Sequence, residues 1–205
     1  MKNYPQSLSA AALKQLRKVE EQRLKDVALF GKVTKRTPDG MRREIEHFPG
    51  MLVAPTLTSN VGRAAQRYTA DGGRLMACAV VTGPAKEGGG ILLISSSKLS
   101  KQDFLLPKGG WDHGESIYKA TWREVLEEGG VNGVFKADLG KQNVGKHVFH
   151  SYLMQGVKKY DQWPESMRYR IWLSWDDAIT LLKAKNHPEM AEIVMRAREA
   201  AARGR

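Results

Sequence analysis

The part of this chain that most restricts its fold is residues 109–131, a glycine pair followed by an acidic helical pattern and a second glycine pair. The second pair ends the helix that the pattern predicts over residues 116–128. Glu124 and Glu128 are four residues apart, and Glu127 lies three residues after Glu124. On a helix all three carboxylates share one face. The segment therefore predicts a loop–helix–loop unit that gathers three acidic side chains.

Three neighbouring carboxylates repel one another unless a cation lies among them. Ligands that are all oxygen select a hard divalent ion, Mg²⁺ or Mn²⁺. Gly109 and Gly110 allow the backbone of the preceding loop to approach that ion, and Glu115 is placed to reach Arg123 and hold the loop against the helix. The short run of residues 123–128, taken alone, would equally suit a solvated helix face.

The spacing of these residues over the whole segment matches a known motif. In single-letter code, residues 109–131 follow G-x5-E-x7-R-E-U-x-E-E-x-G-U, where U is aliphatic. Every defined position agrees with the Nudix box. The chain therefore resembles the Nudix hydrolases, and the resemblance covers residues 67–201.

The resemblance implies an α/β fold, the Nudix α/β/α sandwich with a mixed sheet, and hydrolysis of a diphosphate linked to another group. The metal would activate a water and neutralise phosphate charge. One carboxylate of the box would take the water proton, and which one is left open. The resemblance assigns catalysis to Glu124, Glu127, Glu128, Arg123 and Glu115, and a Mg²⁺ or Mn²⁺ ion to Gly109, Glu124, Glu127 and Glu128.

Hydrophobic patterning predicts the elements around the box. Strands are expected at residues 74–82, 91–96, 104–106, 147–154 and 169–173, and further helices at residues 9–30, 175–183 and 188–201. Strands mixed with a few helices indicate a layered domain. We divide the chain into residues 1–66, an N-terminal basic extension made of a helix and an irregular connector, and residues 67–205, the Nudix domain.

The N-terminal extension is basic. Residues 1–67 contain 13 basic and 6 acidic side chains, a net charge of 13 − 6 = +7, within +11 for the whole chain. The helix over residues 9–30 has an apolar stripe that includes Leu16 and Leu24, and its other face is rich in Lys and Arg. Such charge indicates either a solvated surface or attraction to a polyanion. A nucleic acid or protein partner for the extension stays open.

The flanks of the box resemble one Nudix branch. Residues 106–111 (LPKGGW) and 163–166 (WPES) resemble diphosphoinositol polyphosphate phosphohydrolases and their relatives that cleave diadenosine polyphosphates. The box and tail are also similar to Nudix effectors that oomycete plant pathogens deliver into host cells. Lys108 replaces the first glycine of a GGG variant, and residues 1–60 have no counterpart in short members. The resemblance implies a polyphosphorylated small molecule as substrate, either an inositol pyrophosphate or a dinucleoside polyphosphate.

Basic residues in the matching flanks are the candidates for binding such a substrate. They are Arg67, Arg74, Lys108, Lys146, Arg168 and Arg170. Arg168 and Arg170 lie on either side of Tyr169 in a predicted strand, so both side chains should point to one face. We expect that face to line the phosphate pocket, where an arginine pair would bind phosphates through paired hydrogen bonds.

Two alternatives remain. The chain lacks the SQPWPFPxS stretch of NADH-cleaving members, and no proline occurs between Pro107 and Pro164, where many ADP-ribose-cleaving members have one. These absences disfavour an ADP-ribose or NADH pyrophosphatase without excluding it. The second alternative is a basic Nudix module that binds RNA or a ribonucleoprotein with little catalysis.

Several protein classes are inconsistent with the sequence. The longest apolar runs are too short to cross a bilayer, so no membrane partner is expected. The single cysteine, Cys78, excludes a disulfide scaffold and a Cys-rich zinc site. The N-terminus lacks the apolar core of a secretory signal. We expect a cytoplasmic protein, located in the host cytoplasm or nucleus if the chain is a translocated effector without its leader.

Overall fold

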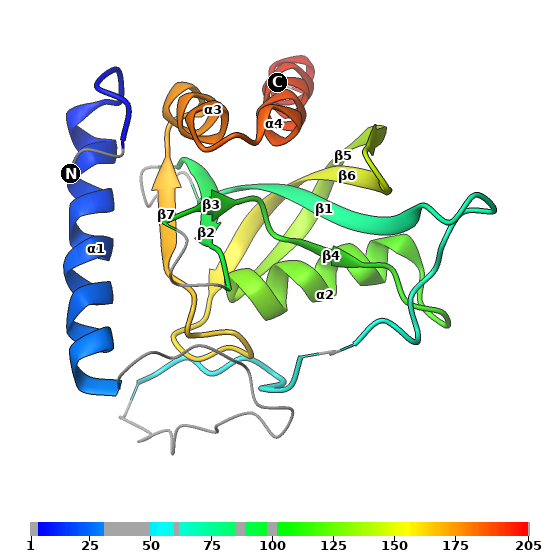
Figure 1. Cartoon of the computed structure of the whole chain (residues 1–205), viewed down its shortest axis with the longest axis horizontal. Helices are drawn as coiled ribbons and strands as arrows, with labels where there is room; N and C mark the ends of the chain where they lie inside the picture. Colours follow the sequence, from blue (N-terminus) through cyan, green and yellow to red (C-terminus); the bar gives the residue numbers. More distant parts are fainter. Residues whose placement is uncertain (1–3, 31–49, 60–61, 85–88, 98–101, 205) are drawn as a thin grey trace.

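A mixed β-sheet separates one helix from two others, as Figure 1 shows. The computed structural model describes residues 4–30, 50–59, 62–84, 89–97 and 102–204. Helix α2 (Ile117–Gly129) covers one face of the sheet, and helices α3 (Trp175–Ala184) and α4 (Pro188–Arg203) cover the other. Helix α1 (Ala10–Phe30) runs beside the edge of the sheet. The predicted α/β/α sandwich with an N-terminal helix is confirmed.

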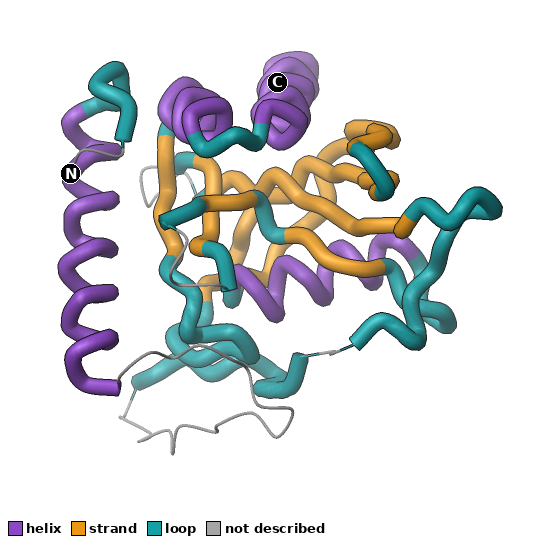
Figure 2. Tube along the Cα trace, viewed as in Figure 1, coloured by secondary structure: helices purple, strands orange, loops and turns teal. Residues whose placement is uncertain are grey.

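The sheet has seven strands in the described residues, and Figure 2 shows them as one layer. They are β1 (Arg74–Thr82), β2 (Ile91–Ser95), β3 (Phe104–Leu105), β4 (Lys108–Gly110), β5 (Val131–Val144), β6 (His147–Lys159) and β7 (Arg170–Leu173). The order is β3-β2-β1-β6-β5, with β4 paired to β1 and β7 paired to β2. Only β1 and β6 run parallel among these pairs, so the sheet is mixed, as predicted.

The central strands are buried on both faces because their sequences are apolar without interruption. Along β1, Cys78 and Val80 belong to the core beneath α3 and α4, while Ala79 and Val81 belong to the core beneath α2. Successive side chains of a strand point to opposite faces, so such a run requires a covering layer on each side. The sheet thereby fixes α2 on one side and leaves the opposite side to the C-terminal helices.

The predicted strands differ from the structure by more than one residue at three strands, since β4 and β5 were not predicted and β6 extends to Lys159, five residues past its predicted end. β5 was not predicted, because it is an edge strand with alternating exposure, three irregularities in its register and several glycines and charged residues. β7 begins at Arg170, one residue later than predicted, and residues 164–168 form turns. Arg168 therefore lies outside the strand that holds Arg170, so the two residues do not alternate along one strand as expected. Both side chains nevertheless bond the C-terminal end of α2, Arg168 at Glu128 and Arg170 at the Gly129 and Gly130 carbonyls.

Helix α1 packs on the rest of the chain instead of standing apart from it. Ala12 and Leu16 of the helix, and Leu8 just before it, are buried in the same core as residues of β1 and α4. The Ser9 N–H and hydroxyl both donate to the carboxylate of Asp177 at the start of α3, over 2.8 and 2.7 Å. Leu24, which we expected in the apolar stripe, is 55% exposed, so the buried stripe is shorter than predicted.

The connector before the domain is described in part. Residues 31–49 of the predicted connector and the predicted end of the helix at Gly31 lie outside the described residues. Further along, Val53 pairs with Gln162 in an isolated bridge, and Ala54 is buried with Leu126 and Trp163. Part of the extension thus packs on the domain, and the boundary at residue 66 stays a prediction.

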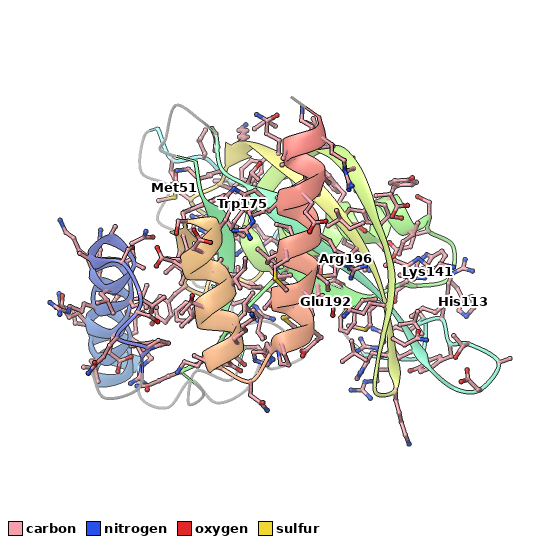
Figure 3. The ribbon with its side chains drawn as sticks, turned by 90° about the horizontal axis from the view of Figure 1, so that it is seen from above. Met51, His113, Lys141, Trp175, Glu192 and Arg196 are labelled. Carbon is pink, nitrogen blue, oxygen red and sulfur yellow. The ribbon has the colours of Figure 1, made fainter. Side chains whose placement is uncertain are left out.

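Helix α4 is fixed to the outer strand β5 by polar contacts. Arg196 donates to the Leu139 carbonyl over 2.9 Å and to the Gln142 side chain over 2.7 Å, and Gln142 donates to Glu192 over 2.7 Å. Figure 3 shows Arg196 and Glu192 on the side of α4 that faces the β5–β6 hairpin. None of the helices in the described part of the chain has the length and apolar character needed to span a membrane.

Candidate active site

Helix α2 carries three carboxylates on a face that the structure buries. Glu124, Glu127 and Glu128 are only 8%, 4% and 8% exposed. The helix begins where Ser116 accepts a hydrogen bond from the Lys119 N–H over 3.2 Å, as an N-terminal cap does. It ends at Gly130, as predicted. The structure therefore brings the three predicted glutamates together.

Gly130 suits the end of α2 for two reasons. Its φ of 59° is in the left-handed region, which favours glycine, and its N–H donates to the Leu126 carbonyl. A Cβ at this position would also collide with the ring of Trp163. The glycine thus ends the helix and lets the following loop pack over it.

A first clasp holds the N-terminal side of this acidic face, and it consists of Arg123, Glu115, Glu124 and the Gly110 carbonyl. Arg123 Nη1 bonds Glu124 at 2.7 Å, and Nη2 bonds Glu115 at 2.8 Å and the Gly110 carbonyl at 2.8 Å. Glu115 also accepts from the Asp112 N–H at 3.0 Å. The arginine thereby joins the helix to the glycine loop, as we predicted for Glu115 and Arg123.

A second clasp holds the C-terminal side, and it consists of Arg168, Glu128, Glu165 and the Ser95 carbonyl. Arg168 Nη2 bonds Glu128 at 2.6 Å, Nε bonds Glu165 at 2.6 Å, and Nη1 donates to the Ser95 carbonyl at 2.9 Å. Glu128 also accepts from the Lys108 N–H at 2.8 Å. Arg168, a predicted substrate-binding residue, is thus buried against the glutamates in this structure.

Charge and burial determine the proton affinities at the site. Burial, followed by the charge of Glu128, raises the pKa of Glu124 to about 8, against the lowering effect of Arg123. Burial alone would lower the pKa of Arg123, but the hydrogen bond to Glu115 and the charges of Glu124 and Glu127 raise it above its ordinary value. Burial would raise the pKa of Glu115, yet the Arg123 hydrogen bond lowers it overall. Arg123 therefore remains charged and compensates part of the negative charge.

The donor set suits a hard divalent cation. It consists of three carboxylates, and the charges of Glu128 and Glu127 disfavour the charged form of Glu124. Beside them lies a glycine whose missing side chain leaves room, because a Cβ at Gly109 would overlap the Glu124 carboxylate. Across the ranges that the structure describes, no three His, Cys, Asp or Glu side chains are grouped as a metal site. Glu124 points to Arg123 and Glu128 points to Arg168 instead. The residues fit a metal by their chemistry.

Two other predicted basic residues lie near the glycine loop. The Arg67 guanidinium lies 4.8 Å from the centre of the Trp111 ring, and its Nε donates to the Asp112 carbonyl over 3.1 Å. Arg74 Nε donates to Gln66 over 2.6 Å. Burial, then the charge of nearby Arg63, lowers the pKa of Arg74. Both arginines thus border the loop that carries Gly109.

The remaining predicted basic residues are divided between two places. The Lys146 carbonyl accepts from the Arg74 N–H over 2.8 Å, so Lys146 lies beside the start of β1. Arg170 lies at the opposite end of α2, 4.0 Å from the centre of the Trp163 ring, and donates to the Gly129 and Gly130 carbonyls over 3.3 and 3.2 Å. Arg170 therefore caps the C-terminus of the helix.

Sequence reasoning missed Glu165, Gln66 and Asp112. Glu165 is 4% exposed, and its N–H donates to the Glu127 carbonyl over 3.0 Å. The sequence did contain a pattern that could have indicated Glu165, because this residue lies within the WPES segment at residues 163–166. Gln66 and Asp112 pair as an isolated bridge, a contact without a sequence pattern.

Comparison with known proteins agrees with this geometry. Residues 73–197 match the NUDIX domain family. The chain belongs to the Nudix family. The Nudix match includes the glycine loop, α2 and both clasps, and the family resemblance that we predicted from residues 109–131 is confirmed.

Individual Nudix relatives come from a plant pathogen and from a plant. Two Phytophthora infestans (strain T30-4) proteins, an RxLR effector protein and the RxLR effector protein CRE5, are 56% and 53% identical over 132 residues, 63% of this chain in each case. The match covers 49% and 52% of them, so the chain spans about half the length of these relatives. Nudix hydrolase 21, chloroplastic, of Arabidopsis thaliana is 40% identical over 136 residues, which cover 62% of this chain and 68% of that protein.

Proposed function

We propose that this chain is a metal-dependent pyrophosphohydrolase that cleaves a diphosphate linkage. The observation that carries the proposal is the row of buried carboxylates Glu124, Glu127 and Glu128, held on α2 beside the Gly109 backbone. Buried charges of one sign are costly. A raised pKa such as that of Glu124 is typical of functional sites, and a diphosphate-cleaving site requires a cation that the three carboxylates would attract.

The residues divide the chemistry among them. Glu124, Glu127, Glu128 and the Gly109 carbonyl would hold Mg²⁺ or Mn²⁺, which supplies an activated water and neutralises phosphate charge when bound. A carboxylate of the box would accept the proton of the attacking water. Arg123 keeps Glu124 in place through the first clasp. The proposed metal ligands thus lie on α2 and on the adjoining glycine loop.

As substrate we propose a polyphosphorylated small molecule, either an inositol pyrophosphate or a dinucleoside polyphosphate. Support comes from the positive charges near the glycine loop: burial and then the charges of Arg74, Lys108 and Arg63 lower the pKa of His147. A concentration of positive charge favours a substrate with many phosphates. Arg67 and Lys146 border the same region, whereas Arg168 and Arg170 add no support, because their donors bond carboxylates and carbonyls of the chain.

The alternative substrate is ADP-ribose, a nucleotide sugar, or the dinucleotide NADH. Tyr118 on α2 is 51% exposed, and its ring packs edge-on against Phe135. An exposed aromatic ring suits stacking on an adenine. The similarity to two proteins named RxLR effectors supports a further proposal, that the hydrolysis takes place inside a host plant cell.

The test is a substrate panel with Mg²⁺: an inositol pyrophosphate, a diadenosine polyphosphate, ADP-ribose and NADH, each with wild type and with Glu124→Gln. Glu124→Gln removes a charged ligand and keeps its shape, so we expect a rate loss of roughly a thousandfold or more. The matched control is Glu199→Gln on the exposed face of α4. Expression of both enzymes in plant leaves, followed by measurement of inositol pyrophosphates, tests the effector proposal. Undiminished turnover in Glu124→Gln would refute the catalytic role, and faster turnover of ADP-ribose or NADH would favour the alternative.

A further inference from the structure

The turn before β7 brings a buried arginine back to the acidic helix. Arg168 is 7% exposed and lies 40 residues from Glu128 along the chain, yet it bonds that carboxylate at 2.6 Å. Its Nε and Nη1 atoms bond Glu165 and the Ser95 carbonyl. Each of the three guanidinium nitrogens thus donates a hydrogen bond to a group of the chain. These donors are already used within the protein, so the side chain is poorly suited to binding a substrate phosphate.

Both oxygens of Glu128 are held. Oε1 accepts from Arg168, and Oε2 accepts from the Lys108 N–H at 2.8 Å. A carboxylate that is fixed at both oxygens cannot rotate freely about its terminal torsion, so its orientation is determined before any ligand binds. The structure thereby sets the direction in which Glu128 presents its remaining lone pairs.

Glu165 supports Arg168 in turn. The Glu165 N–H donates to the Glu127 carbonyl at 3.0 Å, and the Arg168 N–H donates to the Glu165 carbonyl at 2.8 Å. The turn is therefore bonded directly to α2. One guanidinium faces two carboxylates, Glu128 and Glu165, so the second clasp keeps a net negative charge that can still attract a cation.

The next residue fixes the turn from the other side. The Tyr169 N–H donates to the Ser95 hydroxyl at 3.0 Å, and its own hydroxyl donates to Asp26 of α1 at 2.7 Å. The position of Arg168 thus depends on α2, β2 and α1 together. A side chain held in this way is suited to orienting a neighbour and poorly suited to moving toward a substrate.

We propose that Arg168 is a positioning residue for Glu128, with Glu165 as its counter-charge, and that it does not bind substrate phosphates. The inference rests on the proposed function, since it gives Glu128 a role in the metal-dependent hydrolysis. It replaces our expectation that Arg168 lines the phosphate pocket. A positioning role and a substrate-binding role affect different kinetic constants, so they can be separated by experiment.

The experiment compares Arg168→Ala, Arg168→Lys and Glu165→Gln in the full chain, with Arg198→Ala as the control, because Arg198 forms only an exposed pair with Asp176 among the contacts of the described residues. Loss of a partner that orients a ligand residue typically lowers activity or metal affinity by about 10–100-fold. We expect Arg168→Ala to lower kcat by that factor and to leave KM within about twofold, equally for substrates with many and with two phosphates. Arg168→Lys should recover only part of kcat, because an ammonium cannot bond Glu128, Glu165 and the Ser95 carbonyl in one plane.

A second measurement does not depend on turnover. Titration of each protein with Mn²⁺ alone should give a dissociation constant about tenfold higher in Arg168→Ala than in wild type, and unchanged in Arg198→Ala. Thermal melting shows whether each variant folds. If Arg168→Ala does not fold, Arg168→Lys and Glu165→Gln supply the kinetic and binding data in its place.

The outcomes are distinct. A KM that rises more than about tenfold for the many-phosphate substrate alone, with kcat unchanged, would make Arg168 a substrate ligand and overturn the inference. If Arg168→Ala lowers the melting temperature but leaves kcat and the Mn²⁺ affinity unchanged, the Arg168–Glu128 pair only stabilises the fold. That result would also overturn the inference. If wild type hydrolyses no substrate, the proposed function fails, while the Mn²⁺ titration still tests the orientation of Glu128.

Discussion

The two clasps on α2 use the same chemistry over very different distances along the chain. In the first, Arg123 bonds Glu115 eight residues away and Glu124 next to it. In the second, Arg168 bonds Glu165 nearby but reaches Glu128 across 40 residues. Each guanidinium bonds two carboxylates at 2.8 Å or less, and Arg123 also lies 3.7 Å from Glu127. A pattern of spacings can reveal the first clasp, whereas the second exists only because the turn before β7 returns to the helix.

The comparison also shows a difference in what the arginines connect. Arg123 joins two parts of the family motif, the glycine loop and the helix. Arg168 joins the helix to β2 and to the turn that leads into β7. Failure of the first clasp should therefore disturb the whole motif, while failure of the second should disturb mainly one glutamate.

The largest effect is expected for Arg123→Ala. It leaves Glu115, Glu124 and Glu127 without the charge that faces them, and breaking a buried ion pair by removing one partner costs about 3–5 kcal/mol. Activity should fall by at least a thousandfold, roughly the equivalent of about 4 kcal/mol in the barrier. Thermal unfolding and initial rates measure the two losses. Should Arg123→Ala remain more active than Arg168→Ala, the ranking of the clasps would be reversed.

The second prediction concerns pH and asks how completely the first clasp compensates Glu124. The pKa of Glu124 in the folded protein is about 8, above the ordinary value of 4.5. Protonation of Glu124 therefore stabilises the folded, metal-free protein relative to the unfolded chain. That stability is fully present below pH 4.5 and is lost as the pH rises through 8. Melting temperatures of the metal-free protein should therefore fall by several degrees between neutral and alkaline pH. Glu124→Gln should abolish the dependence of the melting temperature on pH, and Mg²⁺ should weaken it in the wild type. The same change of melting temperature with pH in the metal-free wild type, the Mg²⁺-bound wild type and Glu124→Gln would contradict the prediction.

The smallest effect concerns a contact of still longer range, at the edge of the sheet. Gln15 of α1 accepts from the Trp172 N–H at 2.9 Å and donates to the Trp172 carbonyl at 2.5 Å, so its amide pairs with the open side of β7. Gln15→Ala should lower the free energy of unfolding by about 1–3 kcal/mol, since two hydrogen bonds are lost. Gln22→Ala, which removes only an exposed bond to Asp26 on the same helix, is the control. Denaturant titration measures both, and equal losses would show that α1 does not stabilise this edge.

The sequence allowed some parts of the structure to be predicted in detail. The bounds of β1 were predicted to the residue, and those of α2 to within one residue, because an unbroken apolar run and a capped acidic helix are both local signals. The neighbourhood of Arg123 and Glu115 followed from the same spacing. The alternating, glycine-containing β5 gave no comparable signal, since its pairing with β6 depends on the partner strand and not on its own composition.

Placement of the basic residues could not be predicted in this way. Arg168 and Arg170 both reach the C-terminal end of α2, but Arg168 bonds the Glu128 carboxylate whereas Arg170 bonds the Gly129 and Gly130 carbonyls. The groups that meet the two guanidinium groups depend on the path of the turn before β7 past α2, and no spacing within the chain reports that path.

The sequence by itself therefore determined the family, the acidic face of α2 and the clasp of Arg123 with Glu115, because each follows from spacings within one helix and its adjoining loop. Only the tertiary structure decided that Arg168 holds Glu128, that Glu165 supports it and that α1 packs against β7. The Arg168–Glu128 contact joins residues 40 positions apart, and the contact of Gln15 with Trp172 joins residues 157 positions apart. Local patterns specify which way a helix faces, whereas the partner that meets that face is selected by how the whole sheet brings distant segments together.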